Sequence, residues 1–140
     1  RYLAPIIILS SLLLITFYPR LESIPNEPNN KVEFSLEQLN FHRAAGRQVF
    51  VNITADWCLT CKFNEINVLS NAKVLAAFRS TGTVYMQGDW TLPSKEIEDF
   101  LTTQGRAGIP FYGVFYAAKR AKKSMILPEL LTQGMVLKAL

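Results

Sequence analysis

The sequence predicts an α/β domain in which a central mixed sheet is flanked by helices on both faces, preceded by an apolar helix of the transmembrane type. Over residues 31–140, short apolar or β-branched runs alternate with segments of helical periodicity in the order β-α-β-α-β-α-β-β-α. Residues 1–18 form one long apolar stretch, and residues 19–30 are rich in proline and asparagine. We therefore expect a transmembrane helix over 1–18, a linker over 19–30 and a folded domain over 31–140.

The apolar N-terminal stretch carries no charge from Tyr2 to Tyr18, and Arg1 and Arg20 flank it. A helix of that length spans roughly 25 Å, near the lower limit for crossing a bilayer. A cleaved signal peptide is the alternative, but it has a shorter apolar region and a small-residue cleavage motif. A buried core helix is a third interpretation. We favour the transmembrane segment, and because the chain begins with Arg1 we expect a fragment or the end of a longer membrane protein.

The elements of the domain follow from local patterns in chain order. Apolar or β-branched runs predict strands over 31–34, 48–55, 83–86, 111–116 and 124–127. A first helix is expected between an N-cap at Ser35 and a stop at Gly46, with Gln38 as the capping-box partner of Ser35. Helical spacing then continues after the two cysteines as far as residue 78, and returns over 94–104 and 132–140.

The charge pattern argues against nucleic-acid binding. The net charge is +4, and four of the basic residues lie together in the short segment from Lys119 to Lys123. There is no broad basic face and no aromatic-interleaved basic stripe in the sequence. A solvated turn between the last two strands is the interpretation we favour for this segment over a binding patch.

The two cysteines, Cys58 and Cys61, are the only ones in the chain. A disulfide between them would close a very small loop and stabilise the fold little. A tetrahedral zinc site would need two more ligands, and the single histidine, His42, is far away in sequence and expected on a helix surface. Redox chemistry is the remaining interpretation. We expect no metal and no cofactor besides the redox-active disulfide itself.

Cys58 is predicted at the junction between a buried strand and a helix. The thiolate is the attacking species in disulfide exchange, and a helix N-terminus favours the anion through its partial positive charge and free N–H groups. Cys61 follows about one turn deeper into the helix. We therefore expect Cys58 to be the exposed nucleophile and Cys61 to resolve the mixed disulfide.

Two further features point to the same site. Pro110 leads a predicted strand, where a cis Ile109–Pro110 bond would set the Ile109 backbone beside the cysteines to bind an extended peptide. An ordinary trans turn proline is the alternative. Glu65 lies seven residues after Cys58, two turns along one helical face. A carboxylate there could carry the proton of Cys61, although a surface glutamate fits the spacing equally well.

Four stretches carry a family resemblance. A Trp-Cys-x-x-Cys motif after a strand, followed later by Gly-Ile-Pro, resembles thioredoxin. The longer pattern is similar to the C-terminal thioredoxin-like domain of the DsbD/ScsB thiol:disulfide interchange proteins, over roughly Val32 to Leu140, with the end of their transmembrane domain before it. The stretches are "ADWCLTCKFNE" (55–65), "GDWT" (88–91), "GRAGIPFY" (105–112) and "LPELLT" (127–132).

The resemblance implies roles for individual residues. Cys58 would be the nucleophile, Cys61 the resolving thiol, Pro110 the cis-proline and Glu65 the acidic group near the thiols. Trp57 and Ile109 would help bind the partner, Trp57 by packing beside Cys58. One position departs from the pattern: thioredoxins and many relatives place a buried aspartate six residues before the first cysteine, where this chain has Asn52. Because an amide cannot accept the proton, that role would fall on Glu65, on Asp56 or on water.

The resemblance also implies a function. The family passes electrons from cytoplasmic thioredoxin through a transmembrane relay to periplasmic partner domains. We therefore expect a membrane-tethered protein-disulfide reductase at a bacterial inner membrane, with the domain facing the periplasm, no nucleic-acid partner, and protein disulfides or dithiols as partners. An oxidase or isomerase is one alternative, since Leu59 and Thr60 do not fix the direction. A non-catalytic interaction module is another. The sequence assigns no role to Asp89 or Trp90.

Overall fold

The computed structural model describes residue 28, residues 31–120 and residues 122–140. The predicted transmembrane segment and nearly all of the predicted linker lie outside these described residues. Within the described part of the chain, no helix is long and apolar enough to cross a membrane.

The domain is built on one mixed sheet, as the sequence predicts, with the strand order β1-β3-β2-β4-β5. β3 runs parallel to β1 and β2, whereas β4 is antiparallel to both β2 and β5. The parallel and antiparallel pairs meet at β2, which is buried along its whole length. The strands are β1 (Lys31–Glu33), β2 (Val49–Thr54), β3 (Val84–Asp89), β4 (Phe111–Phe115) and β5 (Met125–Ile126).

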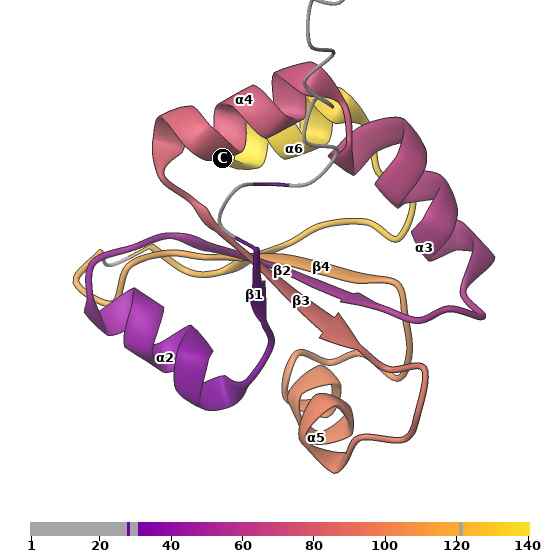
Figure 1. Cartoon of the computed structure of the whole chain (residues 1–140). Coiled ribbons are helices and arrows are strands. Elements are labelled where there is room, and N and C mark those ends of the chain that lie inside the picture. Colours follow the sequence, from indigo (N-terminus) through magenta and orange to yellow (C-terminus); the bar gives the residue numbers. More distant parts are fainter. Residues whose placement is uncertain (1–27, 29–30, 121) are drawn as a thin grey trace, which may run out of the picture.

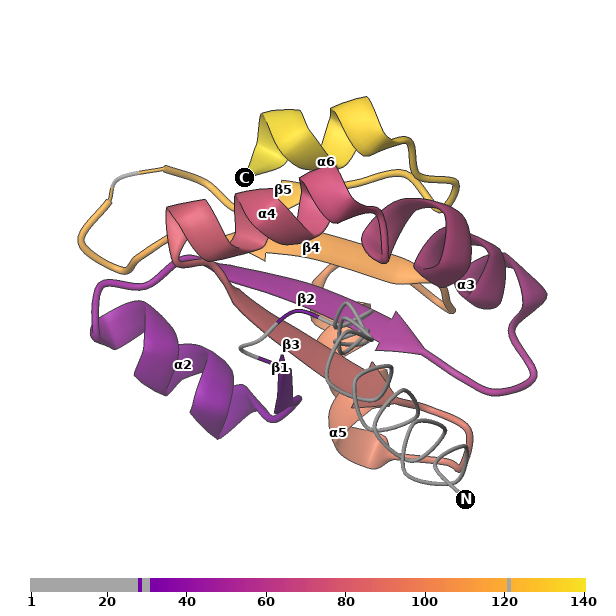
Figure 2. The same cartoon turned by 45° about the horizontal axis from the view of Figure 1, so that its top comes forward.

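Helices cover both faces of this sheet. One face carries α3, α4 and α6, and the other carries α2 and α5 (Figure 1), an arrangement that Figure 2 shows from a second direction. The two faces therefore form two separate hydrophobic layers. The helices are α2 (Leu36–Ala44), α3 (Leu59–Asn64), the π-helical turn η1 (Glu65–Leu69), α4 (Ala72–Thr81), α5 (Lys95–Thr103) and α6 (Gln133–Ala139).

The helix boundaries follow from side-chain caps. The expected cap Ser35 accepts a hydrogen bond from the Gln38 backbone N–H, and Ser94 caps α5 in the same way from Ile97. The long helix expected after the cysteines is divided. Its first part ends in η1, and Asn71 then caps a new helix, α4, by accepting from the Lys73 N–H. A local capping residue thus overrides a continuous apolar periodicity.

The two hydrophobic cores share the central strands. In β4, Tyr112 and Val114 belong to the core under α4 and α6, whereas Phe111 and Phe115 belong to the core on the opposite face. Alternation along a fully buried strand therefore supplies side chains to both layers. The end of β2, and the cysteine motif after it, are therefore fixed by the strands on either side and by both cores.

The expectation for His42 is wrong. Its side chain is 6 % exposed rather than on the helix surface, and it packs edge-on against the Phe41 ring. Its Nδ1 has no hydrogen-bond partner within the described part of the chain. Burial, and then the nearby charge of Arg47, lowers the pKa of His42. The neutral imidazole behaves here as a core side chain.

Candidate redox site

Cys58 and Cys61 form a disulfide at the start of α3. Cys58 is the N-cap residue of the helix, and its Sγ accepts a hydrogen bond from the Cys61 backbone N–H at 3.2 Å. The strand β2 ends at Thr54, so the motif leaves the sheet at the carboxyl end of a buried central strand. Within the described residues, no three His, Cys, Asp or Glu side chains are grouped to hold a metal ion.

The two sulfurs differ in access to solvent. Cys58 is 7 % exposed, whereas Cys61 is fully buried. Both pack with Ala55 in a small cluster of their own beside the two main cores. Cys58 is therefore the more accessible cysteine, but it is buried, whereas the sequence predicted an exposed residue.

The two residues that lead into β4, Ile109 and Pro110, lie next to this cluster. The Ile109–Pro110 peptide bond is cis, as expected from the sequence. Ile109 packs against the cluster that contains both cysteines, and Pro110 is buried at the start of β4. The structure thus brings together Cys58, Cys61 and Ile109, which lie about fifty residues apart in the chain.

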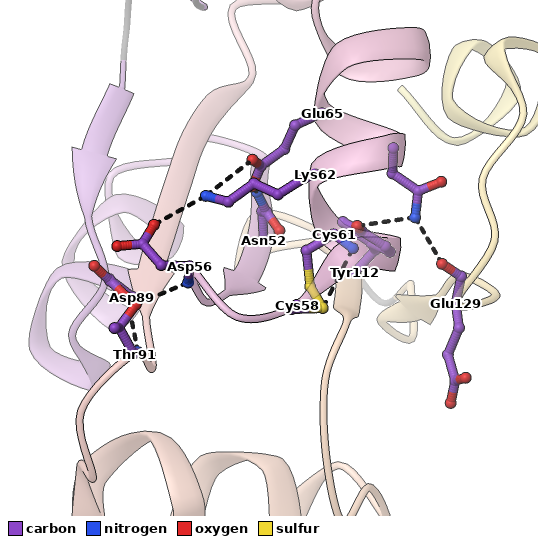
Figure 3. The surroundings of a disulfide bond; sticks show 11 residues. Asn52, Asp56, Cys58, Cys61, Lys62, Glu65, Asp89, Thr91, Tyr112 and Glu129 are labelled. Carbon is purple, nitrogen blue, oxygen red and sulfur yellow. Dashed lines mark hydrogen bonds and ion pairs between the residues drawn. A yellow bond between two sulfur atoms is a disulfide. The ribbon is translucent and has the colours of Figure 1, made fainter.

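Glu65 meets Asn52 inside the molecule. The Glu65 side chain is 24 % exposed, and its Oε1 accepts a hydrogen bond from Asn52 Nδ2 at 3.4 Å. Asn52 is fully buried and also donates to the Tyr85 hydroxyl at 2.8 Å. Figure 3 shows the Glu65 carboxylate next to the Lys62 side chain. The position that departs from the thioredoxin pattern therefore contacts the glutamate predicted from the spacing.

Lys62 links two carboxylates next to the motif. Its Nζ lies 3.1 Å from Asp56 Oδ1 and 3.8 Å from Glu65 Oε2. The hydrogen bond to Asp56, and then the charge of Glu65, raises the pKa of Lys62. The Asp56 side chain is largely exposed, so this pair is worth little to stability. The single ammonium offsets one of these two carboxylate charges, so this side of the disulfide keeps a net negative charge.

Apolar side chains are exposed around the motif. Leu59, Phe63 and Leu130 are exposed and line one open depression together with Thr60. Trp57, directly before Cys58, is 61 % exposed, and its indole N–H donates to the Thr91 carbonyl at 3.3 Å. Large apolar side chains are thus exposed on the residues directly before and after Cys58.

Asn64 is a site residue that the sequence reasoning missed. It is fully buried, and its Nδ2 donates to the Tyr112 hydroxyl at 3.0 Å and to the Glu129 carbonyl at 2.7 Å. Its Oδ1 accepts from the Leu131 N–H at 3.1 Å. The amide therefore holds the "LPELLT" segment against α3, and Figure 3 shows Tyr112 and Glu129, which both accept from it. The sequence offered one signal for this role. Asn64 lies three residues after Cys61, and residues at that spacing share one face of a helix.

These features define a protein with a thioredoxin-like oxidoreductase fold and a Cys-x-x-Cys disulfide. The chain belongs to the thioredoxin-like family, whose pattern matches residues 32–125. No curated protein matches the sequence.

Solved structures resemble the chain in fold. The reduced C-terminal domain of Neisseria meningitidis DsbD is 18% identical, with a TM-score of 0.60, over 76% of this chain and 95% of that one. A thioredoxin from Thermus thermophilus is also 18% identical, with a TM-score of 0.58, over 78% of this chain and 83% of that one. At this identity the likeness shows the fold.

Proposed function

We propose that this protein is a membrane-tethered thiol:disulfide oxidoreductase that reduces protein disulfides through Cys58 and Cys61. The observation that carries the proposal is the position of Cys58. Its sulfur caps α3 and accepts the Cys61 N–H, and it is the more accessible of the two. A thiolate at that position gains a hydrogen bond and the favourable end of a helix dipole.

The exchange proceeds in two steps. The Cys58 thiolate attacks one sulfur of a partner's disulfide, which forms a mixed disulfide and releases the partner's other sulfur as a thiolate that takes up a proton. Cys61 then loses its proton and attacks the Cys58 sulfur. The Cys58–Cys61 disulfide forms, the second partner thiol leaves, and two electrons have moved to the partner.

Neighbouring residues support these steps. Glu65 takes the Cys61 proton, and the Asn52 amide orients its carboxylate without competing for that proton. Ile109 and Pro110 offer the partner's backbone a place beside the sulfurs. Trp57 provides exposed apolar surface for the partner.

The location rests on the sequence. The apolar segment 1–18 would anchor the domain in a bacterial inner membrane, and the linker 19–30 would hold it on the periplasmic side. Resemblance to the DsbD/ScsB family makes a transmembrane electron relay the source of electrons. The recipients would be periplasmic partner domains.

Insulin reduction tests the exchange. The 140-residue chain should accelerate the reduction of insulin disulfides by dithiothreitol, and Cys58→Ser should abolish the acceleration. Cys61→Ser should instead accumulate a mixed disulfide through Cys58, because no resolving thiol remains. Full activity in Cys58→Ser would show that this site does not carry the exchange. A mixed disulfide that forms through Cys61 in Cys58→Ser, with none formed in Cys61→Ser, would reverse the assigned order of attack.

Equilibration with glutathione tests the direction. A reductase should have a reduction potential below about −200 mV, closer to the roughly −270 mV of thioredoxin than to the roughly −120 mV of DsbA. A value well above that limit would make the protein an oxidant or isomerase.

A further inference from the structure

The stretch from Asp89 to Thr91 follows β3 and lies beside the turn that leads into the disulfide. That turn closes through a hydrogen bond from the Cys58 N–H to the Ala55 carbonyl at 3.1 Å. Its two middle residues, Asp56 and Trp57, are both exposed, so they depend on contacts from elsewhere for a fixed position. Thr91 supplies one contact to each of them, and Lys62 adds an ion pair with the Asp56 side chain.

Thr91 holds the turn at two points. Its Oγ1 accepts a hydrogen bond from the Asp56 backbone N–H at 2.9 Å, and its carbonyl accepts from the Trp57 indole N–H at 3.3 Å. These are the two residues directly before Cys58. Thr91 is thirty-five residues away from Asp56 in sequence, so the contact exists only because β2 and β3 lie side by side.

Asp89 orients the Thr91 hydroxyl. Asp89 Oδ1 accepts both the hydroxyl proton and the backbone N–H of Thr91 (Figure 3). Because the hydroxyl proton is committed to Asp89, an oxygen lone pair is free to accept the Asp56 N–H. The same two bonds, the hydroxyl bond first, lower the pKa of Asp89, so the carboxylate stays ionised at neutral pH.

The chain around Thr91 is anchored independently of its hydroxyl. The Trp90 N–H donates to the Thr54 carbonyl at 2.7 Å, which extends the pairing of β2 with β3 by one residue. The Trp90 side chain packs against the core under α2 and α5. Removing the hydroxyl should therefore free the Asp56 backbone while the segment, and its carbonyl contact with Trp57, stay in place.

We propose that Thr91, oriented by Asp89, is a positioning residue that holds the Asp56–Trp57 turn in the geometry needed to dock a protein disulfide at Cys58. This inference rests on the proposed exchange function and extends it to the "GDWT" stretch. A small dithiol reaches the Cys58 sulfur without using the indole. We call the two hydrogen bonds that join Thr91 to the turn the latch. Loss of the latch should therefore slow the reaction with a protein disulfide and leave the reaction with dithiothreitol unchanged.

The test compares Thr91→Val with Thr91→Ser in the 140-residue chain. Valine keeps the shape and the carbonyl but removes the hydroxyl, whereas serine keeps the hydroxyl. Thr91→Val should lower kcat/KM for insulin about fivefold, the effect expected for one hydrogen bond, and Thr91→Ser should restore it. The rate at which dithiothreitol reduces the Cys58–Cys61 disulfide should be unchanged in both variants. The backbone amide hydrogen of Asp56 should exchange with solvent faster in Thr91→Val and not in Thr91→Ser.

The outcomes separate the two proposals. An inactive wild-type chain, equal to Cys58→Ser, would overturn the exchange function and the role of the latch with it. An active wild-type chain with a fully active Thr91→Val, or with Thr91→Ser as impaired as Thr91→Val, would overturn the latch alone. An equal loss with insulin and dithiothreitol would also overturn it. If Thr91→Val does not fold, Asp89→Ala, which leaves the hydroxyl unoriented, should show the same selective loss for insulin.

Discussion

At Asn64, one buried amide makes three hydrogen bonds that join α3, β4 and the segment before α6. Truncation to alanine would leave the Leu131 N–H and the Glu129 carbonyl without their partner and open a cavity. We expect Asn64→Ala to lower the free energy of unfolding by about 3 kcal/mol.

The matched control for this substitution is Asn67→Ala. Asn67 lies one turn further along, and its exposed amide donates to the Phe63 carbonyl at 2.8 Å. Its loss should cost less than about 0.5 kcal/mol. Urea unfolding measures both variants, and similar costs for the two would show that the buried amide is not a structural link.

Tyr112 makes the free energy of unfolding depend on pH in the alkaline range. Burial raises its pKa to about 12, above the ordinary tyrosine value of 10.0. Between those values the unfolded chain releases this proton first, so the folded chain binds more protons and the free energy of unfolding falls as pH rises. Below pH 10 both states keep the proton, and the contribution is constant. The expected loss is on the order of 2 to 3 kcal/mol by pH 12.

Urea unfolding from pH 8 to 11.5 checks this expectation. Tyr112→Phe has no phenol to titrate at that position, so its stability should fall less steeply above pH 10. All other side chains are the same in both proteins, so their contributions cancel in the difference. Parallel curves for the two proteins would show that the buried phenol does not titrate in this range.

At the scale of elements, β4 depends on a glycine. A Cβ built on Gly113 would lie 2.9 Å from Phe115 Cε2 and 3.1 Å from Phe111 Cε1. Both rings are buried in the same core, so they cannot move aside freely. Gly113→Ala should therefore destabilise the protein by roughly 1 to 3 kcal/mol, a cost typical of overpacking.

Gly134 in α6 provides the opposite case. A Cβ added there meets nothing within 4 Å, and the position is helical. Gly134→Ala should raise stability by about 0.5 kcal/mol, because alanine loses less backbone entropy in a helix. Thermal unfolding of the two variants should give shifts of opposite sign, and a neutral Gly113→Ala would mean that β4 tolerates a side chain on that face.

At the scale of the whole molecule, the two cores lie on opposite faces of one sheet and share β2 and β4. Because both cores use the same central strands, the unfolding of one core removes the sheet that supports the other. We therefore expect the fragment 31–140 to unfold in one cooperative transition and to keep the insulin activity of the longer chain. Fluorescence and circular dichroism should report the same midpoint. Two separate transitions would show that the layers fold independently.

Part of the fold and site was predictable because it depends on neighbours in sequence. The caps Ser35 and Ser94, the apolar run of β2 and the placement of Cys58 at a strand–helix junction are local signals. The cis bond before Pro110 was expected from its strand-leading position combined with the cysteine motif. Periodicity failed at Asn71, where a single capping side chain starts a new helix.

The sequence by itself indicated redox chemistry, because two cysteines separated by two residues at a helix start have few other uses. Only the tertiary structure decided which polar groups serve that site. Asn52 meets Glu65, Asn64 holds the Leu131 backbone and Thr91 holds Asp56, across separations of 13, 67 and 35 residues. Each contact requires a side chain's direction as well as its spacing. That direction is set by the pairing of strands and the packing of helices, which no local pattern encodes.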